Sequence, residues 1–504
     1  MLSIFDQGPP PACPRPFNMA AHVLAAGETR PEATALSVLS EHTHEDWSFG
    51  ALRAAVLGTA TGLLAQGLVP GNIVLMRLGN TVDFPIAYLA ALAAGLVPCP
   101  TSAALTEAET ARILTDLAPA AVLRDPTVAC PPHPLTISLE TLRGMRTLPP
   151  ADFHMGDPDR LAYVIYTSGT SGLPRAVAHA HRAIWARQMM FDGWYGLRPA
   201  DRLLHAGAFN WTYTLGTGLM DPWTRGATAL IAAPGTPALA LPALLRAHRA
   251  TIFAAAPGIY RQMLQQEDRL VLPDLRHGLS AGEKLAPRIA AAWRAATGTT
   301  VFEAYGMSEI STFISSSPDR PAPEGSLGRP QPGRRVAILG PDGPVARGEE
   351  GSIAVHRDDP GLMLGYLGAP DETRARFQGD WFVTGDQGVM AEDGSIAYLG
   401  RRDDMMNAGG FRVSPIEVEQ ALLHFPGVTS IGVVDVEIRP DVRVIAAFYT
   451  APEALDEDAL RRYAGERLAR YKQPRLYIHM SELPYGANGK LLRRALRSGF
   501  EANK

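Results

Sequence analysis

The chain has 504 residues, of which 46% are hydrophobic and 19% are charged, and this balance is typical of a folded globular protein rather than a disordered one. Its length predicts about three domains, or fewer if one of them is large. Lys and Arg total 47 against 51 Asp and Glu, and the net charge of −4 argues against a nucleic-acid partner bound through bulk charge. Any bound anion must therefore be held by local groups.

The cysteines and the first residues of the chain bear on the compartment. Cys13, Cys99 and Cys130 are scattered and form no CxxC pair, which disfavours a disulfide framework or a cysteine zinc site and predicts a cytoplasmic protein. The N-terminus lacks the basic start and apolar core of a secretory signal. The longest apolar candidate, 84–97, is shorter than the ~18 residues that a membrane helix needs. We therefore predict no membrane partner and a buried helix at that position.

The first third of the chain alternates between helix and strand patterns after a proline-rich lead. A capping box, Thr106 to Glu109, predicts the start of a helix that runs to Leu117. Further helix patterns cover 51–66 and 82–94, and strand patterns cover 72–78, 96–98, 120–123 and 161–166. Because helices separate the strands, we expect parallel sheets covered by helices. The last strand, LAYVIY, is apolar throughout, which is typical of a strand buried on both faces.

The pattern changes at about residue 325. Short β-like runs at 335–339, 351–355 and 395–399 are separated by Gly, Pro and Asp turns, which predicts a small antiparallel sheet or a distorted barrel. After the charged run at 401–404, a compact unit follows, with helix patterns at 415–424 and 456–469 and strand patterns at 428–434 and 442–449. The predicted fold is α/β, with a large N-terminal domain over 1–402 and a small α+β domain over 403–504.

The most informative stretch, YTSGTSGLPR at 166–175, follows the apolar strand. Glycines let backbone N–H groups approach an anion, hydroxyls add donors, and Arg175 supplies a fixed positive charge. This chemistry predicts a phosphate cradle, although the GxxxxGK[ST] pattern of a Walker A loop is absent. The alternative is a flexible Ser/Gly loop. It accounts less well for the apolar strand before the loop and the helix pattern at 183–191 after it.

Five motifs in order resemble the adenylate-forming superfamily, which includes acyl-CoA synthetases, peptide-synthetase adenylation domains and luciferases. The family loop reads [ST]SG[ST][ST]GxPKG, and this chain has TSGTSGLPRA, with Arg175 for the usual Lys and Ala176 for the usual Gly. The other motifs are EAYGMSE at 303–309, WFVTGDQG at 381–388, GRRDD with GGFR at 400–412, and LPYGANGKLLR at 483–493. Each motif alone is modest, but five in register are specific.

The resemblance implies an acid–CoA ligase whose cofactors are ATP, Mg²⁺ and coenzyme A. A carboxylate attacks the α-phosphorus of ATP to give an acyl-AMP and pyrophosphate, and the thiol then displaces AMP. The implied catalytic residues are Lys490, Glu309, Ser308 and Arg175, with Glu309 also the metal ligand. The residues implied to contact the nucleotide or coenzyme A are Thr167, Ser168, Gly169, Thr170, Ser171, Gly172, Gly282, Glu283, Glu303, Ala304, Tyr305, Gly306, Asp386, Arg401, Gly409, Gly410 and Phe411.

Several of these residues have distinct implied roles. Tyr305 would lie against adenine and Asp386 would accept the ribose hydroxyls. Asp403 matches the family's hinge, about which the C-terminal domain rotates between the two half-reactions. In one orientation Lys490 reaches the reacting groups. In the other, the segment 409–411 lines a tunnel for the pantetheine thiol.

The segment FNWTYTL at 209–215 bears on which small-molecule carboxylic acid is the substrate. The expected acyl pocket contains Asn210, Trp211, Tyr213, Gly258 and Met307. Acetate-specific relatives carry a Trp where this chain has Gly306, and amino-acid-activating relatives carry an Asp where it has Asn210. Both differences disfavour those acids, and the segment 226–228 also resembles benzoate–CoA ligases. An aromatic acid is therefore the first expectation and a short or medium aliphatic acid is the second.

Two other functions stay open at the sequence level. A stand-alone adenylating enzyme would load the acid onto a carrier protein instead of coenzyme A. A regulatory nucleotide-binding protein with decayed catalysis is suggested by Arg175 and Ala176. A second copy of the chain, in a homodimer, is also left open as a partner.

Overall fold

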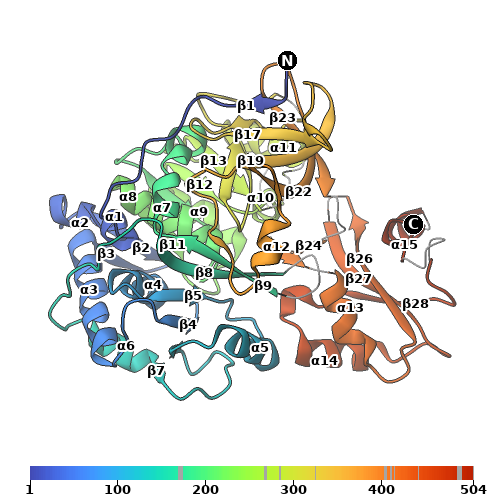
Figure 1. Cartoon of the computed structure of the whole chain (residues 1–504), viewed down its shortest axis with the longest axis horizontal. Coiled ribbons are helices and arrows are strands. Elements are labelled where there is room, and N and C mark those ends of the chain that lie inside the picture. Colours follow the sequence, from blue (N-terminus) through green and yellow to red (C-terminus); the bar gives the residue numbers. More distant parts are fainter. Residues whose placement is uncertain are drawn as a thin grey trace.

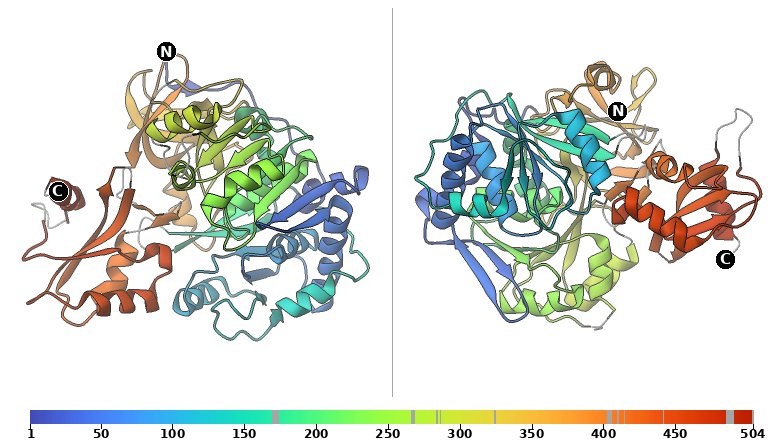
Figure 2. Two further views of the ribbon diagram at one scale, coloured as in Figure 1. Left: turned by 180° about the vertical axis from the view of Figure 1, so that it is seen from behind. Right: turned by 90° about the horizontal axis from the view of Figure 1, so that it is seen from below.

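The computed structural model of the chain describes residues 1–168, 174–265, 269–282, 285, 287–323, 325–401, 406–408, 411–413, 415–440, 442–484 and 491–502. A large body, coloured blue to light orange, stands beside a smaller C-terminal unit, coloured dark orange to red (Figure 1). Views from behind and from below show the smaller unit to one side of the body (Figure 2). The predicted α/β class, with a large N-terminal and a smaller C-terminal part, is confirmed.

One sheet of the body runs in the order β16-β15-β14-β13-β12-β10-β11-β2-β3. Its central strands pair in parallel and its edges are antiparallel, as expected where helices separate the strands. The strands are β2 (Thr34–Leu39), β3 (His44–Ser48), β10 (Arg202–His205), β11 (Thr228–Ala232), β12 (Ile252–Ala254), β13 (His277–Ala281), β14 (Thr300–Met307), β15 (Ser311–Ser315) and β16 (Arg329–Pro330).

A second, wholly parallel sheet runs in the order β5-β4-β6-β7. Its strands are β4 (Ile73–Arg77), β5 (Val97–Pro100), β6 (Ala121–Arg124) and β7 (Thr136–Ser138). The helices near it are α3 (Phe49–Ala65), α4 (Asp83–Ala93), α5 (Glu107–Leu117) and α6 (Leu139–Met145). Every residue of α4 is buried, so the predicted buried helix is confirmed. One apolar cluster joins α3 and α4 to strands of both sheets, and this cluster is the main core.

The capping box at the start of α5 is also confirmed. The hydroxyl of Thr106 accepts from the backbone N–H of Glu109 at 3.3 Å. The carboxylate of Glu109 accepts from the backbone N–H of Thr106 at 2.9 Å. These reciprocal bonds satisfy donors that the first turn of a helix otherwise leaves unpaired.

The strand before the glycine-rich loop differs from its prediction. β8 (Leu161–Ser168) pairs antiparallel with β9 (Pro174–Ala180), which pairs with β20 (Gly365–Tyr366), so the loop connects two strands rather than a strand and a helix. Burial on both faces is wrong, because Val164 is buried whereas Tyr163 and Ile165 are only partly so. Those two side chains line a cavity, which explains why the run is apolar throughout.

The antiparallel sheet predicted after residue 325 is confirmed. Its main path runs β1-β17-β19-β22-β21, with β18 on β17 and β23 on β22. The strands are β1 (Ile4–Phe5), β17 (Val336–Gly340), β18 (Gly343–Pro344), β19 (Glu350–His356), β21 (Phe377–Gln378), β22 (Trp381–Met390) and β23 (Ile396–Arg401).

The C-terminal unit has the predicted helices and strands. Its sheet is β26 (Ser430–Arg439), β27 (Val442–Thr450) and β28 (Leu476–His479), and a hairpin of β24 (Met406–Ala408) and β25 (Phe411–Val413) precedes it. The helices are α13 (Pro415–Leu423), α14 (Glu457–Arg467), the 3₁₀ turn η4 (Arg470–Lys472) and α15 (Arg493–Ala502). The predicted boundary at 402–403 lies outside the described residues and stays a prediction.

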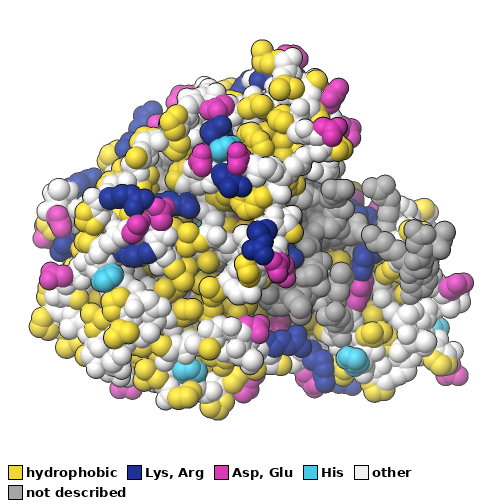
Figure 3. Space-filling view, viewed as in Figure 1, with side chains coloured by type: hydrophobic (Ala, Val, Ile, Leu, Met, Phe, Trp, Pro, Cys, Tyr) yellow, Lys and Arg dark blue, Asp and Glu magenta, His cyan; other side chains and the backbone are white. Residues whose placement is uncertain are grey.

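The remaining helices belong to the body. They are α1 (Met19–Val23), α2 (Ala26–Thr29), α7 (Arg182–Ala186), the π-helices η1 (Phe191–Tyr195) and η2 (Thr214–Met220), α8 (Asp221–Arg225), the 3₁₀ helix η3 (Ala238–Ala240), α9 (Leu241–Ala247), α10 (Pro257–Met263), α11 (Pro287–Thr297) and α12 (Pro370–Arg374). Within the described ranges, no helix is both long and apolar enough to span a membrane. On the face drawn in Figure 3, basic and acidic side chains are interspersed.

Candidate active site

Two cavities meet inside the molecule. The first, of about 300 Å³, lies between the body and the C-terminal unit, and we call it the cleft. The second, of about 210 Å³, lies within the body, and we call it the inner cavity. Residues that line both cavities define their junction: Ile165, Trp211, Thr212, Gly282, Gly306, Met307 and Ser308. A molecule at the junction can therefore reach both spaces.

The cleft and the inner cavity have different walls. The cleft is further lined by Pro100, Thr101, Ser102, Leu105, Glu109, Arg112, Ile113, Tyr166, Thr167, Arg175, Asn210, Glu309, Tyr366, Arg376, Phe411, Glu417, Tyr471 and Lys472. The inner cavity is further lined by Met19, Tyr88, Tyr163, His179, Ala183, Ile184, Arg187, Tyr213, Leu215, Gly216, Met220, Ala281, Ile310, Ser311, Thr312 and Gly361.

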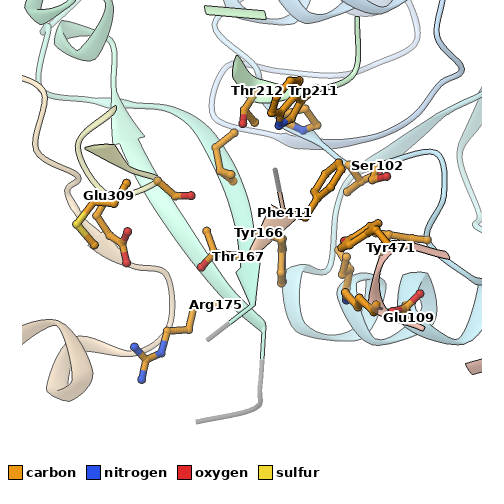
Figure 4. A pocket seen from close by; sticks show the side chains of 18 of the residues that line it. Ser102, Glu109, Tyr166, Thr167, Arg175, Trp211, Thr212, Glu309, Phe411 and Tyr471 are labelled. Carbon is orange, nitrogen blue, oxygen red and sulfur yellow. Dashed lines mark hydrogen bonds and ion pairs between the residues drawn. The ribbon is translucent and has the colours of Figure 1, made fainter. Parts of the chain in front are cut away.

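One side of the cleft holds a chain of charged and phenolic groups. The hydroxyl of Tyr366 donates to Glu309 at 2.8 Å, and the guanidinium of Arg175 lies 5.0 Å from the centre of the Tyr366 ring. Arg175 also forms an ion pair with Glu372 at 2.7 Å. Burial and the neighbouring Glu309 charge raise the pKa of Tyr366, so this phenol stays a donor. The carboxylate and the cation are thereby held on the same wall (Figure 4).

This wall suits a magnesium ion bound together with phosphates. Mg²⁺ in such sites takes one or two carboxylates and completes its shell with phosphate oxygens and water. Glu309 is a nearly buried carboxylate that lines the cleft, and Tyr366 donates to its Oε1. Among the described residues, no group of three or more His, Cys, Asp or Glu could form an all-protein metal cage. The donor set therefore fits a metal held mainly by its phosphate partners.

The predicted phosphate loop is described only at its ends. Thr167 and Arg175 face one another in the register of β8 and β9, and both line the cleft. Ala176 lies within β9 and has no positive φ, in keeping with its replacing a glycine. Outside the described residues lie Gly169, Thr170, Ser171 and Gly172, together with Glu283, Asp403, Gly409, Gly410 and Lys490. The side chains of Ser168 and Arg401 are also outside that description.

The motif at 303–309 reaches the cavities only with its second half. Glu303 accepts from the backbone N–H of Leu285 at 3.0 Å, and Ala304 is buried in the core. Gly306, Met307 and Ser308, at the end of β14, line both cavities and so belong to the junction.

Tyr305 and Asp386 are bonded to one another. The hydroxyl of Tyr305 donates to Asp386 at 2.5 Å, and that of Tyr398 donates to it at 3.4 Å. Asp386 is fully buried, and neither it nor Tyr305 lines the cleft or the inner cavity. Arg401 pairs with Asp386 in the register of β22 and β23. The adenine and ribose roles of this pair stay predictions.

Gly306 is required by the backbone itself. A Cβ there would lie 2.2 Å from the carbonyl oxygen of Ser311 and 2.5 Å from the Cα of Thr312, where β15 crosses closely. Real Cβ atoms do not approach backbone this closely, so any side chain would force the strands apart. The close approach of the backbone therefore explains the glycine without reference to the acid. Its presence is weaker evidence against acetate than the sequence suggested.

The C-terminal unit contributes an aromatic wall to the cleft. Phe411 of β25 stacks on Tyr471, with ring centres 4.1 Å apart, and its ring lies 6.2 Å from that of Trp211. Figure 4 shows Phe411 between Trp211 and Tyr471. The predicted tunnel residue thus lies beside the junction.

A buried ion cluster joins the two parts of the chain, and no motif predicted it. The ammonium of Lys472 donates to Glu417 at 2.8 Å and to Glu109 of α5 at 3.1 Å, and all three side chains are less than 10% exposed. Burial opposes the charge, but Tyr471 and the two carboxylates outweigh it and raise the pKa of Lys472. Glu109 was recognisable only as part of the capping box, because its partner lies 363 residues away. We call this cluster the Lys472 clasp.

Arg376 is a second residue that sequence reasoning missed. Its guanidinium donates to the carbonyl of Thr384 at 2.7 Å and lies 5.4 Å from the ring centre of Phe382. It lines the cleft and adds a fixed cation to a space that would hold phosphates. No motif marks it, since a lone Arg is common in any turn-rich segment.

The inner cavity is mainly aromatic and aliphatic. Trp211 and Tyr213 meet edge to face with ring centres 5.1 Å apart, just before the π-helix η2, and both line the cavity with Met307. Of the other predicted pocket residues, Asn210 lines only the cleft, and Gly258 lines neither space. π-Helical turns are frequent at functional sites, which agrees with the place of η2.

One cation on the wall of the inner cavity is already neutralised. The guanidinium of Arg187 donates to both oxygens of Asp221, at 2.8 and 2.6 Å, and also to Ser311 at 2.5 Å. The Arg187 and Asp221 side chains are 13% and 1% exposed. Bidentate pairs of this kind are strong and fix the plane of the guanidinium. The cavity therefore presents little net charge.

Comparison with known proteins agrees with this arrangement. The model of the AMP-binding enzyme family matches residues 24–367, and that of the AMP-binding enzyme C-terminal domain matches residues 417–490. The chain is 30% identical over 464 residues to a benzoate–CoA ligase of Thauera aromatica, which covers 86% of each chain. It is 31% identical over 349 residues to the human mitochondrial acyl-coenzyme A synthetase ACSM2A, covering 66% of this chain and 60% of that protein.

A solved structure extends the similarity to the fold. The benzoate CoA ligase from Burkholderia xenovorans LB400 superposes with a TM-score of 0.69 at 28% identity, covering 95% of this chain and 100% of that one. The family match spans more than half of the chain, and the similarity to the Thauera protein spans most of it. The chain therefore belongs to the AMP-binding enzyme family.

Proposed function

We propose that the protein is an ATP-dependent acid–CoA ligase that forms an acyl-AMP and then an acyl-CoA thioester. The observation that carries the proposal is the junction of the two cavities. There an apolar space of about 210 Å³ opens beside a charged wall with Glu309 and Arg175, and Phe411 approaches from the C-terminal unit. The apolar cavity suits an acyl group, the charged wall suits a nucleotide, and the wall at Phe411 suits a thiol, and all three meet at the junction.

In the first half-reaction, the carboxylate must approach a triphosphate that is also negatively charged. The acid's carboxylate would lie at the junction, where Ser308 can donate to it or to a phosphate oxygen. Glu309 would hold Mg²⁺, which when bound neutralises phosphate charge. Arg175 and Arg376 would add fixed positive charge, and Thr170 and Lys490 are proposed to complete the set.

In the second half-reaction, a thiol must reach the carbonyl carbon from the cleft. Phe411 and Tyr471 provide an apolar wall beside Trp211 at the junction, which suits the pantetheine arm. We propose that Gly409 and Gly410 continue this wall. The proposed domains are 1–402 and 403–504, with Asp403 as the hinge about which Lys490 is brought in and withdrawn.

The proposed acid is aromatic, with a short or medium aliphatic acid as the second choice. A dry cavity of about 150 Å³ can hold benzene, so 210 Å³ is enough for one ring with a substituent. Tyr88, Tyr163, Trp211 and Tyr213 supply flat walls for such a ring. An amino acid is disfavoured, because the described lining residues of this cavity include no carboxylate to pair with an ammonium.

The cysteines fit the proposed cytoplasmic location. Cys13, Cys99 and Cys130 are all free thiols, and the last two are buried. Thiols of this kind are kept reduced in a cytoplasm.

The test is a reaction with a panel of aryl and aliphatic acids, ATP, Mg²⁺ and coenzyme A, in which pyrophosphate, AMP and thioester are measured separately. We expect equal amounts of AMP and acyl-CoA. AMP and pyrophosphate without a thioester would favour the carrier-protein alternative, which holo-carrier protein added in place of coenzyme A would then test. No pyrophosphate with any acid would contradict the adenylating function itself.

A further inference from the structure

A histidine on the wall of the inner cavity has a nitrogen that none of the described residues satisfies. His179 of β9 lies opposite Tyr163 of β8, and the two rings are stacked with centres 4.8 Å apart. The residue is 3% exposed and lines the cavity. Its Nδ1 is buried and has no hydrogen-bond partner among the described residues. A buried polar atom of this kind is uncommon and calls for an explanation.

The protonation state of this ring follows from its other nitrogen. Nε2 lies 2.7 Å from the carbonyl oxygen of Ser308, and because a carbonyl only accepts, Nε2 carries the hydrogen and donates it. Burial lowers the pKa of His179 to about 4, so the ring is neutral near pH 7. Nδ1 is therefore a lone-pair acceptor on the cavity wall.

The charges around the cavity restrict what can donate to this acceptor. An ammonium group would be buried without a partner, because the described lining residues of the cavity include no carboxylate and Asp221 already pairs with Arg187. A second carboxylate would find no free cation among the described lining residues, because Arg187 already pairs with Asp221 in bidentate fashion. A neutral hydroxyl or an aromatic amine meets neither obstacle.

We propose, in an inference that rests on the proposed function, that the acid carries a neutral hydrogen-bond donor on its acyl group and that His179 Nδ1 accepts from it. The substrate class is thus a hydroxy- or amino-substituted acid, with an aryl acid as the first choice. His179 recognises the substituent through this hydrogen bond, while the aromatic walls contact the ring. An acid without the donor leaves the acceptor unpaired, which is the situation in which binding sites discriminate most strongly.

The first experiment uses the wild-type protein. Acid-dependent exchange of labelled pyrophosphate into ATP is measured for benzoate and for hydroxy-, amino- and fluorobenzoates substituted at each ring position. Fluorine supplies a small substituent without a donor, so the fluoro acid is the matched control for each position. We expect one position at which the donor acid exceeds its fluoro partner in kcat/KM by about tenfold to a hundredfold. Aliphatic acids are compared in the same way, each hydroxylated acid with its unsubstituted partner.

Three variants assign the preference to a residue. His179→Phe keeps a ring against Tyr163 and removes the acceptor, so the ratio between donor and fluoro acid should fall to about one. His179→Gln keeps both a donor for Ser308 and an acceptor, and should retain most of the ratio. Tyr213→Phe removes from the same wall another buried oxygen that has no hydrogen-bond partner in the described part of the chain, and it should leave the ratio unchanged.

The ratio separates recognition from structural damage. Loss of the bond to the Ser308 carbonyl in His179→Phe affects both acids alike, and this effect cancels in the ratio. The inference is overturned if wild type shows no preference for donor acids, if the preference survives in His179→Phe, or if it follows Tyr213. If pyrophosphate exchange is equal for donor and fluoro acids, only this inference is contradicted. If no acid supports exchange, the proposed function is contradicted.

Discussion

The cleft and the inner cavity meet at one junction, yet their walls are built from different parts of the chain. The described wall of the inner cavity comes entirely from residues up to 361, between β8, β9, η2 and the end of β14. The cleft is closed by Phe411, Glu417, Tyr471 and Lys472 of the C-terminal unit. Under the proposed function, the acid is recognised in a space whose described wall belongs to the body alone, whereas the thiol would enter a space that the C-terminal unit helps to form.

The two spaces also differ in how they treat charge. In the cleft, charged side chains line the wall, and they include the Lys472 clasp together with Glu309, Arg175 and Arg376. In the inner cavity the cation of Arg187 is neutralised, and the notable polar atom is an uncharged acceptor on His179. This contrast suits charged reactants in one space and a neutral acyl group in the other.

Removing the cation from the Lys472 clasp should give the largest effect. Lys472→Met leaves Glu109 and Glu417 buried without their partner, and breaking a buried pair in this way costs about 3–5 kcal/mol. We expect the C-terminal unit to detach or unfold first, which limited proteolysis and hydrogen exchange would detect. Arg461→Met, which breaks an ion pair with Glu457 whose side chains are about half exposed, is the control and should cost less than about 1 kcal/mol. Equal effects in the two variants would show that the Lys472 clasp does not hold the C-terminal unit in place.

Glu309→Gln should reduce adenylation by about a hundredfold to a thousandfold, because an amide is a much weaker magnesium ligand than a carboxylate. The measurement is Mg²⁺-dependent pyrophosphate exchange, with circular dichroism to establish that the protein is folded. Glu372→Gln is the matched control, because Glu372 pairs with Arg175 but is half exposed and does not line the cleft. Unchanged exchange in Glu309→Gln would show that this carboxylate does not hold the metal.

Phe411→Ala should separate the two spaces functionally. We expect the thioester-forming step to slow by about tenfold to a hundredfold, since its wall beside Trp211 is lost, while adenylation changes little. Single-turnover experiments that follow acyl-AMP formation and its consumption by coenzyme A measure the two steps separately. Tyr471→Phe keeps the stacked ring and serves as the control. A loss confined to adenylation would contradict the assignment of Phe411 to the thiol path.

The last prediction concerns how stability depends on pH through a residue of the inner cavity. The folded-state pKa of His179, about 4, lies below its ordinary value of 6.5. Stability is therefore full above pH 6.5 and is lost as the pH falls towards 4, because the unfolded chain then binds a proton that the folded chain does not. In that window wild type should lose up to about 1.4 kcal/mol per pH unit more than His179→Gln, which cannot titrate. Urea unfolding of both proteins between pH 7.5 and pH 4.5 measures the difference, and other buried histidines cancel. Parallel pH profiles would mean that His179 is not held neutral by the fold.

Local patterns predicted most of the fold. The capping box at Thr106, the buried helix α4 and the antiparallel region after residue 325 follow from signals within a few residues of one another. The hairpin of β8 and β9 was missed because the helix pattern at 183–191 indicated a helix as the element after the loop, and because the pairing of β9 with β20 joins segments far apart in the chain. The same apolar run can line a cavity or enter a core, and only the tertiary structure distinguishes the two.

The residues that were expected in the cleft, and that line it, are those that belong to a motif. Thr167, Arg175, Trp211, Ser308, Glu309 and Phe411 were expected from their motifs, and all line the cleft. Tyr366, Lys472 and His179 were not expected, because the partner of each is distant in sequence, and Arg376 was not expected because no motif marks it. The bond between Tyr305 and Asp386 is a similar case, since the motifs identified both residues but not their contact.

The central claim is that one junction joins an acid in the inner cavity to a nucleotide in the cleft. It is tested most directly by a crystal structure with an acyl-sulfamoyl adenosine, a stable mimic of the acyl-AMP, made from the best acid of the exchange panel. We expect the acyl group inside the inner cavity against His179 and Trp211, and the sulfamoyl group at the junction beside Ser308 and Glu309. An acyl group bound outside the inner cavity, or an analogue bound away from Glu309, would contradict the account.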